Sequence, residues 1–302
     1  MRFEMAKELF QGVLAFPVTP FDESGERIDL RSYERLLNHV IEGGVHAVIP
    51  LGSTGEFAYL STPERQQLAE ATVSITKGRI PAVIGISAIT TKETIGLAEH
   101  AEASRADGVM ISIPTYYALG ADEVVAHVEK VARSVKLPVM LYNNPFTSQV
   151  DLTGDTIARM VHIENLVAIK EATMDVNRIS LLKSRFGNRF EVLGGGFDPY
   201  AFPAFCLGVR GWTTGMANIV PSRCVALHRT VVVESNLVEG RKQHEKLLPL
   251  ANLLVELGLS KAVKAALHVL GLSVGPARNP LGRLSVENEK RLAAVLVDLG
   301  VL

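Results

Sequence analysis

The sequence predicts a (β/α)8 TIM barrel with a helical C-terminal region. Three observations indicate this α/β fold: eight short apolar runs recur along the chain, helical patterns fill the gaps between them, and 47% of the 302 residues are hydrophobic. Alternating strands and helices are typical of a parallel sheet covered by helices. Eight such units match a closed barrel.

Most of the eight runs have the length and the Val and Ile content of buried parallel strands. In chain order they are GVLAFPVTP from Gly12, HAVIPLGSTG from His46, IPAVIGIS from Ile80, DGVMISIP from Asp107, LPVMLYNNP from Leu137, NLVAIKEAT from Asn165, FEVLGGGFD from Phe190 and GVRGWTTGM from Gly208. A doubly wound open sheet is the alternative. It would more often carry a glycine-rich nucleotide fingerprint after its first strand, and VLAFPVTPFD is not one.

Helix signals lie between the runs. Apolar residues within positions 30–41 follow the three- and four-residue spacing of one helix face. Thr62 before Pro63 predicts an N-cap followed by proline at the first helical position, and Thr90 with Glu93 predicts a capping box.

The strand signals stop after about Val233, and the pattern stays helical to Leu302. We therefore expect the barrel to occupy residues 1–233 and a helical C-terminal region to occupy residues 234–302. No low-complexity linker separates them, so we expect the two parts to move as one body.

Composition disfavours several classes of function. The net charge is −1 and no long run of like charges occurs, so we expect neither nucleic acid nor an anionic membrane as a partner. The N-terminal stretch lacks the apolar segment of a signal peptide, and no apolar run is long enough to span a bilayer. We expect a cytoplasmic protein with Cys206 and Cys224 as free thiols. The eight histidines lack metal-ligand spacing, so we expect no catalytic metal.

The sixth run carries a lysine where chemistry is expected, because TIM-barrel active sites lie at the C-terminal ends of the strands. Strand alternation places Ala168 and Lys170 inward, with Val167 and Ile169 facing the outer helices and Glu171 outward for packing or an ion pair. Burial lowers the pKa of a lysine, and the neutral amine can form a Schiff base with a carbonyl carbon. A solvated surface lysine is the alternative interpretation.

The neighbouring runs supply the other groups that such chemistry needs. Tyr142 has inward parity, and its phenol could carry protons; a core tyrosine with a satisfied hydroxyl is the alternative. After the second run, Gly52 and Gly55 permit close backbone approach, while successive N–H groups and the hydroxyls of Ser53 and Thr54 suit a carboxylate. An ordinary tight turn would also explain this GSTG stretch.

The glycine-rich stretch from Gly194 is interpreted as a permissive turn that leaves the seventh strand. We expect substrate to pass close to this turn, at Gly195. Trp212 is expected in the core. A phosphate loop is not evident after the seventh and eighth strands, so we expect no pyridoxal phosphate.

The combination of motifs resembles the dihydrodipicolinate synthase/N-acetylneuraminate lyase family. GSTGE after the second run, YN-x-P after the fifth and IKEAT in the sixth occur in the family's order and spacing, and PTYYALG from Pro114 is similar to its paired-tyrosine loop. The resemblance covers nearly the whole chain. It implies a class I, Schiff-base mechanism on a 2-oxo acid such as pyruvate, without a metal or an organic cofactor.

The resemblance also implies roles for single residues. Lys170 matches the lysine that captures the 2-oxo acid, and Tyr142 matches the proton-relaying tyrosine. Ser53 matches the hydroxyl that links this tyrosine to a second one, and Thr54 matches the carboxylate-binding threonine. Tyr117 matches the second tyrosine, which reaches into a neighbouring subunit's site in the family. A homo-oligomer is implied, usually a tetramer.

Two departures bear on the second substrate. Thr147 stands where the synthases carry an arginine for the carboxylate of the incoming aldehyde, and an arginine from elsewhere, such as Arg210 or Arg278, is the alternative source of that group. The sialic acid lyases have an acidic pair after the seventh strand to bind sugar hydroxyls; Asp198 is present here, but Pro199 takes the second place. We therefore expect pyruvate to react, with weak turnover of an aspartate-derived semialdehyde.

The first hypothesis is an aldolase-type lyase that cleaves or condenses a 2-oxo acid through Lys170. The alternative is a Schiff-base dehydratase or deaminase of a deoxy-oxo sugar acid or a hydroxyproline-derived imine, because one iminium serves both reactions. A binding protein with a retained barrel is a third, non-enzymatic possibility. The intact set of Lys170, Tyr142, Ser53 and Thr54 argues against it, since a binder needs no reactive amine.

Overall fold

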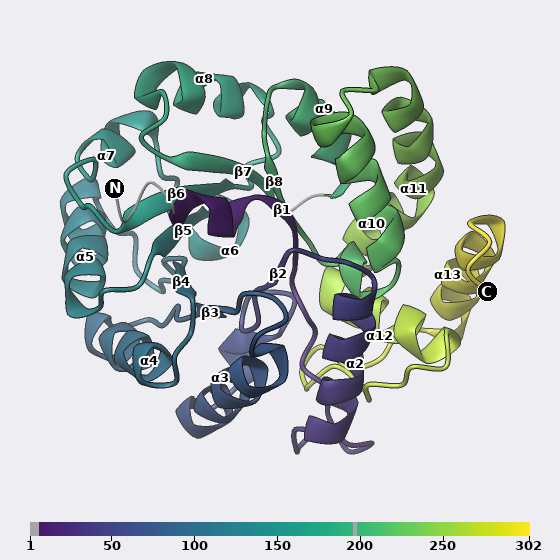
Figure 1. Ribbon diagram of the computed structural model, residues 1–302. Coiled ribbons are helices and arrows are strands. Elements are labelled where there is room, and N and C mark those ends of the chain that lie inside the picture. Colours follow the sequence, from purple (N-terminus) through teal and green to yellow (C-terminus); the bar gives the residue numbers. More distant parts are fainter. Residues whose placement is uncertain (1–5, 196–197) are drawn as a thin grey trace.

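The computed structural model of the protein describes residues 6–195 and 198–302. Eight parallel strands form one sheet in the order β2-β1-β8-β7-β6-β5-β4-β3. A parallel bridge between Val48 and Ala82 joins its two edges, so the sheet closes into the predicted TIM barrel (Figure 1). The strands are β1 (Gly12–Ala15), β2 (Ala47–Val48), β3 (Val83–Gly85), β4 (Gly108–Ile111), β5 (Val139–Asn143), β6 (Leu166–Glu171), β7 (Glu191–Gly195) and β8 (Gly211–Thr214).

Helices surround the barrel. They are α2 (Leu30–Glu42), α3 (Thr62–Thr76), α4 (Thr91–Ala103), α5 (Ala121–Ser134), α6 (Pro145–Ser148), α7 (Gly154–Ala158), α8 (Asn177–Phe186), α9 (Ala201–Cys206), α10 (Pro221–His228), α11 (Leu237–Leu257), α12 (Leu259–Val269) and α13 (Val286–Asp298). Thr90 caps α4, accepting from the Glu93 N–H at 3.2 Å. This is one half of the predicted capping box; the Glu93 carboxylate accepts from Thr62 Oγ1 at 3.3 Å. The cap of α3 is Ser61 rather than Thr62, because the Ser61 N–H donates to Glu64 Oε2 at 2.8 Å in a capping box.

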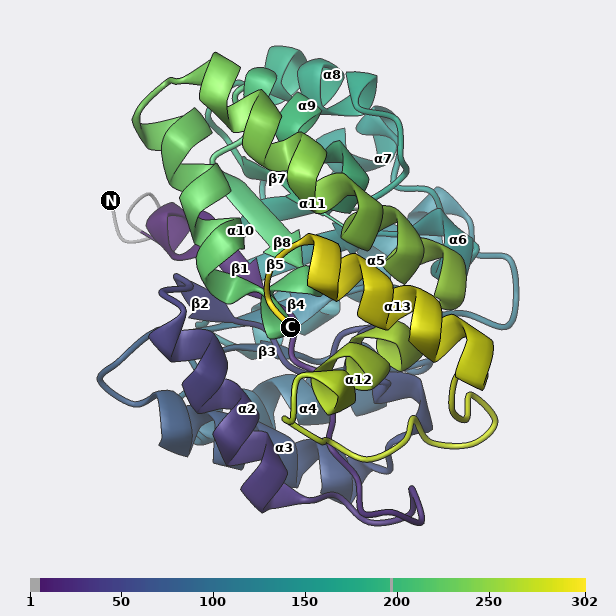
Figure 2. The same ribbon diagram turned by 90° about the vertical axis from the view of Figure 1, so that its right-hand side faces the viewer.

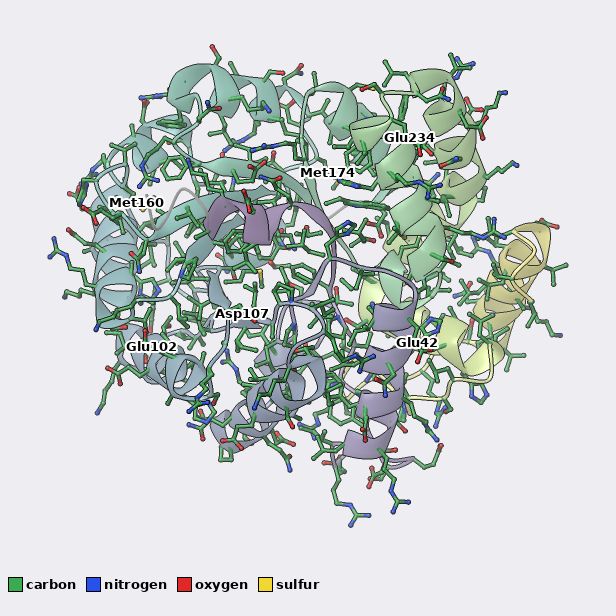
Figure 3. All side chains as sticks on the ribbon, viewed as in Figure 1. Glu42, Glu102, Asp107, Met160, Met174 and Glu234 are labelled. Atoms are coloured by element: carbon green, nitrogen blue, oxygen red, sulfur yellow. The ribbon has the colours of Figure 1, made fainter. Side chains whose placement is uncertain are left out.

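Two apolar clusters pack on opposite faces of the strands. The inner one fills the barrel with side chains such as Leu14, Ile49 and Met140, so the barrel is a packed core rather than a pore (Figure 3). Ile169 packs with the outer cluster, as predicted. Val167 does not: it belongs to the inner cluster. A register shift between β5 and β6 pairs the residues on either side of Val167 and leaves Val167 as a bulge, and bulges re-aim side chains.

The C-terminal helices α11, α12 and α13 lie together on one side of the barrel (Figure 2). Between α12 and α13 the segment 270–285 is irregular, although the pattern was expected to stay helical. Gly271, Gly275, Pro276, Pro280 and Gly282 explain the difference, because glycine and proline both disfavour helix. The division of the chain after residue 233 stays a prediction. Within the described ranges, no helix combines the length and apolar character needed to cross a bilayer.

Candidate active site

Lys170 lies inside the barrel near its C-terminal end. Strand β6 pairs with β5 so that Lys170 is directly opposite Tyr142. The lysine is 4% exposed, and its Nζ lies 3.7 Å from the ring centroid of Tyr142 and 3.8 Å from that of Phe16. Two aromatic faces therefore contact the amine, an arrangement that also suits a cationic form of the nitrogen.

The electrostatics of this position favour a neutral amine. Burial lowers the pKa of Lys170 to about 7, and the negative charge of Asp198 partly opposes the shift. Burial also raises the pKa of Asp198 to about 6, while hydrogen bonds and the positive charge of Lys170 partly oppose that rise. A substantial fraction of Lys170 is thus neutral near pH 7, as nucleophilic attack on a carbonyl requires.

Tyr142 is buried beside the lysine, and burial raises the pKa of its phenol to about 12. Hydrogen bonds with Asn144 and Ser53 oppose that rise. The Asn144 Nδ2 donates to Tyr142 Oη at 2.9 Å. The structure thus brings Ser53 and Tyr142 together. Sequence reasoning missed Asn144, although it lies two residues after Tyr142 and shares its strand parity.

The turn after β2 is tightly built. A Cβ atom at Gly52 would lie 2.7 Å from the Phe16 ring, so only glycine fits there. The Gly55 N–H donates to Gly52 O at 3.0 Å, and the Glu56 N–H donates to Ser53 O at 3.1 Å. The turn bonds therefore use two of the successive N–H groups. The N–H groups of Ser53 and Thr54 take no part in these two bonds. The anion-binding nest therefore includes fewer N–H groups than the sequence predicted.

The C-terminal region holds this turn in place. Glu56 has a left-handed backbone with φ of 58° and forms a buried ion pair with Lys264 of α12, Nζ to Oε1 at 2.6 Å. The Arg278 backbone N–H donates to Glu56 Oε2 at 2.8 Å. Ser260 Oγ donates to Ser53 O at 3.2 Å. Sequence reasoning missed this support, because no local period connects residues so far apart.

On the other side of Lys170, β7 provides space. A Cβ at Gly195 would lie 2.6 Å from Lys170 Cε and 2.3 Å from Thr213 Oγ1, so Gly195 makes room for the lysine itself. The Asp198 carboxylate accepts from the Met216 N–H at 3.3 Å and also bonds with the side chains of Thr214 and Trp212. It is therefore turned towards the end of β8.

Tyr117 and Thr147 lie away from this cluster. Tyr117 is 75% exposed and packs edge-on against Tyr116. Among the described residues, Tyr142 hydrogen-bonds with Asn144 and Ser53 rather than with Tyr117. Thr147 is exposed on the short helix α6.

The two arginines that could have replaced the missing guanidinium are engaged elsewhere. Arg210 pairs with Glu191. Arg278 pairs with Glu64 at 2.8 Å and lies over the Phe21 ring at 4.3 Å. Neither therefore compensates for Thr147.

The outer face of the same two strands is braced by a polar network. Asn143, the neighbour of Tyr142, donates through Nδ2 to Glu171 Oε2 and to Asp151 Oδ1, each at 3.1 Å. Arg178 pairs with Asp151 at 2.9 Å and with Glu171 at 3.4 Å. The expected ion pair at Glu171 is confirmed. This network ties β5 to β6 directly behind Tyr142 and Lys170.

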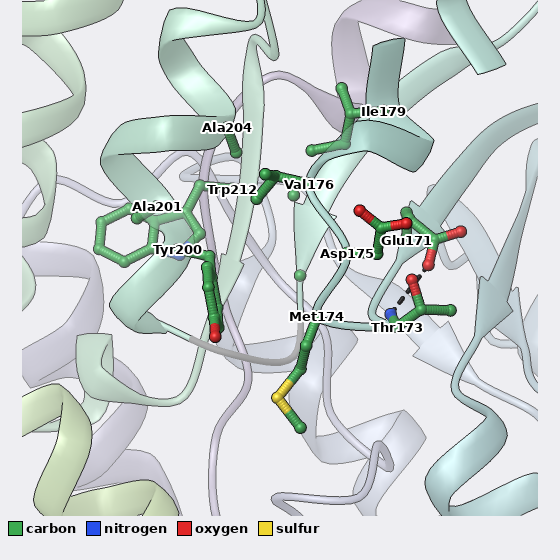
Figure 4. Close-up of a pocket in the computed structure, with 12 residues that line it drawn as sticks. Glu171, Thr173, Met174, Asp175, Val176, Ile179, Tyr200, Ala201, Ala204 and Trp212 are labelled. Atoms are coloured by element: carbon green, nitrogen blue, oxygen red, sulfur yellow. Dashed lines mark hydrogen bonds between the residues drawn. The ribbon is translucent and has the colours of Figure 1, made fainter. Parts of the chain in front are cut away.

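A small cavity of about 30 Å³ lies beyond this network, between the ends of β6 and β7 and helices α8 and α9 (Figure 4). Glu171, Thr173, Tyr200 and the core residue Trp212 line it. Such a volume holds about one water molecule, so it is not a substrate site. In the part of the chain that the structure describes, no group of three His, Cys, Asp or Glu side chains could hold a metal.

Comparisons with known proteins identify relatives of this chain. The model of the dihydrodipicolinate synthetase family matches residues 9–299. The 4-hydroxy-tetrahydrodipicolinate synthase of Syntrophobacter fumaroxidans is 33% identical over 97% of this chain and 100% of its own. The dihydrodipicolinate synthase structure from Thermotoga maritima superposes with a TM-score of 0.91, at 33% identity, over 97% of this chain and 100% of its own. A structure described as the first monomeric dihydrodipicolinate synthase variant matches with a TM-score of 0.91, at 32% identity, over 98% of this chain and 99% of its own.

Proposed function

The chain belongs to the dihydrodipicolinate synthetase family, whose enzymes are aldolase-type lyases, and we propose that Lys170 forms a Schiff base with a 2-oxo acid such as pyruvate. One observation carries the proposal: a buried amine with a pKa of about 7 lies against the ring of a buried tyrosine at the barrel end where active sites occur.

The proposed chemistry starts when neutral Lys170 attacks the keto carbon. The resulting carbinolamine loses water, with Tyr142 and Ser53 moving the protons, and leaves an iminium. The iminium withdraws electrons from the adjacent carbon, which loses a proton to become an enamine, or from the next C–C bond, which breaks. Thr54 and the free N–H groups of the turn after β2 are the proposed carboxylate clamp.

The second substrate of the reaction is a separate matter. Relatives are named 4-hydroxy-tetrahydrodipicolinate synthases, and the family resemblance implies an aldehyde that carries a carboxylate. Here Thr147 is a neutral, exposed residue, and Arg210 and Arg278 are paired elsewhere. We therefore propose weak turnover with an aspartate-derived semialdehyde. A coupled assay with that semialdehyde at synthase-like efficiency would contradict this part.

The exposed Tyr117 supports the proposal of a homo-oligomer, in which this side chain enters a neighbouring subunit's site. A related structure is described as a monomeric variant, so the assembly has to be measured for this chain. Light scattering should show more than one chain per particle, with Tyr117→Phe reducing turnover. A fully active monomer would refute the shared tyrosine.

Borohydride trapping tests the Schiff base directly. Incubation with pyruvate and borohydride should add one reduced pyruvyl group to the peptide that contains Lys170, and Lys170→Ala should abolish the adduct. Lys264 is the matched control, because it is also buried and its pKa is also lowered, to about 8. Labelling of Lys264 with equal efficiency, or no labelling at all, would overturn the assignment.

A further inference from the structure

Asn144 has a hydrogen-bonding arrangement that the proposed mechanism does not use. It is 7% exposed, and its Nδ2 donates to Tyr142 Oη at 2.9 Å. Its Oδ1 is buried and has no hydrogen-bond partner among residues 6–195 and 198–302. Asn144 precedes helix α6, yet its side chain does not cap that helix. The side chain is therefore directed to the site rather than to local structure.

The direction of the bond to Tyr142 has a consequence for the phenol proton. An amide N–H can only donate, so it occupies a lone pair of the phenol oxygen and leaves the phenol proton free. That proton can then be given to Ser53 or to a bound molecule. After the proton has left, the Asn144 N–H still bonds the tyrosinate, and bonds to an ionised acceptor are stronger.

The free Oδ1 indicates what else binds here. Buried polar atoms almost always have a hydrogen-bond partner, so an orphaned acceptor beside a proposed reactive group indicates a donor supplied by a ligand. The two amide atoms share one carbon, which keeps Oδ1 close to the phenol oxygen. An amide oxygen accepts only, so it attracts a hydroxyl and repels a carboxylate. This preference of Oδ1 for a neutral donor agrees with Thr147, which stands where the synthases carry an arginine for a carboxylate.

We propose that Asn144 is a specificity-determining residue, whose Oδ1 accepts a hydrogen bond from a hydroxyl next to the aldehyde carbon of the second substrate. The inference rests on the proposed function and names its substrate class, a neutral α-hydroxyaldehyde. In the cleavage direction, the enzyme releases an aldehyde of the same class as a product.

The bond changes balance within the site. The enamine carbon on Lys170 bonds to the aldehyde carbon, the carbonyl electron pair moves to oxygen, and that oxygen takes the Tyr142 proton. This leaves an iminium and a tyrosinate held by Asn144. Water then adds to the iminium carbon while Tyr142 recovers a proton from it. The carbinolamine collapses to the keto product, and its hydroxyl proton passes to the departing Lys170 amine.

Three small aldehydes that differ in the group near the aldehyde carbon test the inference when each is mixed with pyruvate. Glycolaldehyde carries the hydroxyl, propanal replaces it with a methyl group, and succinic semialdehyde carries a carboxylate. Mass spectrometry of the 4-hydroxy-2-oxo acid products gives kcat/KM for each. A site that hydrogen-bonds a substrate hydroxyl discriminates strongly against the analogue without it, so we expect the wild type to prefer glycolaldehyde over propanal by at least about 10-fold.

Two variants separate the two functions of the amide. Asn144→Leu removes the acceptor at similar size, so the preference for glycolaldehyde over propanal should fall to about 1. Asn144→Asp keeps an acceptor but loses the donor to Tyr142, so the preference should survive while kcat falls for both aldehydes. Asn252→Leu, the same exchange at an exposed position on α11, is the control and should keep the wild-type ratio. Because the preference for glycolaldehyde over propanal is a ratio, a general loss of active protein cancels from it; the fall in kcat of Asn144→Asp is referred to the amount of Lys170 that pyruvate and borohydride label.

The outcomes distinguish the inference from the proposed function. Failure to trap pyruvate on wild-type Lys170 overturns the proposed function and the inference with it. Successful trapping overturns the inference alone if propanal equals glycolaldehyde, if succinic semialdehyde is preferred, if Asn144→Leu keeps the wild-type ratio, or if none of the three aldehydes gives a product.

Discussion

Replacing Gly195 by alanine tests whether the space beside Lys170 is part of the site. The added Cβ would lie 2.6 Å from Lys170 Cε, 2.7 Å from its Cγ and 2.3 Å from Thr213 Oγ1. Unbonded carbon atoms prefer separations of about 3.5–4.0 Å, so the lysine stem has to move by about 1 Å. A misplacement of about 1 Å costs on the order of 10²-fold in rate, and we expect pyruvate capture to slow by that factor.

The assay is the single-turnover rate of borohydride-trapped pyruvate on Lys170, measured by mass spectrometry and accompanied by a thermal melt. Gly96→Ala is the matched control. Apart from the chain neighbours and the nearby backbone of its own helix α4, no atom of the described residues lies within 4 Å of the Cβ position at Gly96. Alanine there should leave the capture rate unchanged and stabilise the protein by about 0.4–1 kcal/mol.

Two results would refute the reasoning. Capture by Gly195→Ala at the wild-type rate would show that the lysine stem does not occupy the space beside β7. Equal slowing in Gly96→Ala would show that the assay reports a general change in the protein. A melting temperature close to that of the wild type identifies a slow Gly195→Ala variant as a displaced lysine rather than a damaged fold.

Three further predictions follow from the same geometry. The rate of pyruvate capture should rise with pH, with its midpoint near the Lys170 pKa of about 7. Asp198→Asn should lower that midpoint, because it removes the negative charge that favours the ammonium form; an unmoved midpoint would show that Asp198 does not influence the pKa of Lys170. Tyr142→Phe should lower kcat by about 10²–10⁴-fold, whereas an effect on KM alone would contradict proton transfer. Glu56→Gln should destabilise the fold by about 3 kcal/mol in urea titrations, because it leaves Lys264 buried without its partner. Adding Lys264→Met should recover part of the lost stability; if the destabilising effects of the two substitutions simply add, the pair does not interact.

Strand periodicity made the positions of Lys170 and Tyr142, the centre of the proposed site, predictable. Alternation has a period of two, so a run of a few residues is enough to place Lys170 and Tyr142 inward, and the structure pairs them directly across β5 and β6. The same rule failed at Val167, because the bulge inserts one residue without any distinctive side chain. Alternation is reliable only where the strand pairing is regular.

Interactions between distant segments could not be predicted. The Glu56–Lys264 pair joins the turn after β2 to α12, and the bonds of Asp198 depend on where the end of β8 lies. A charged residue in an apolar stretch, such as Lys264, indicates an amphipathic helix and says nothing about its partner. The segment 270–285 shows the opposite error, because its glycines and prolines were outweighed by the helical patterns on both sides.

The parts of the proposed site differ in what holds them, and this difference explains how specificity could diverge within one scaffold. The amine and the phenol are on adjacent strands, braced behind by Asn143 and Glu171, so their relative position depends on the barrel itself. The turn after β2, the proposed carboxylate clamp, depends on α12 and on segment 270–285. Asn144 belongs to neither support: it lies at the end of β5, where the chain leaves the sheet for α6. An exchange there can alter what approaches Tyr142 without disturbing the strands that hold Lys170.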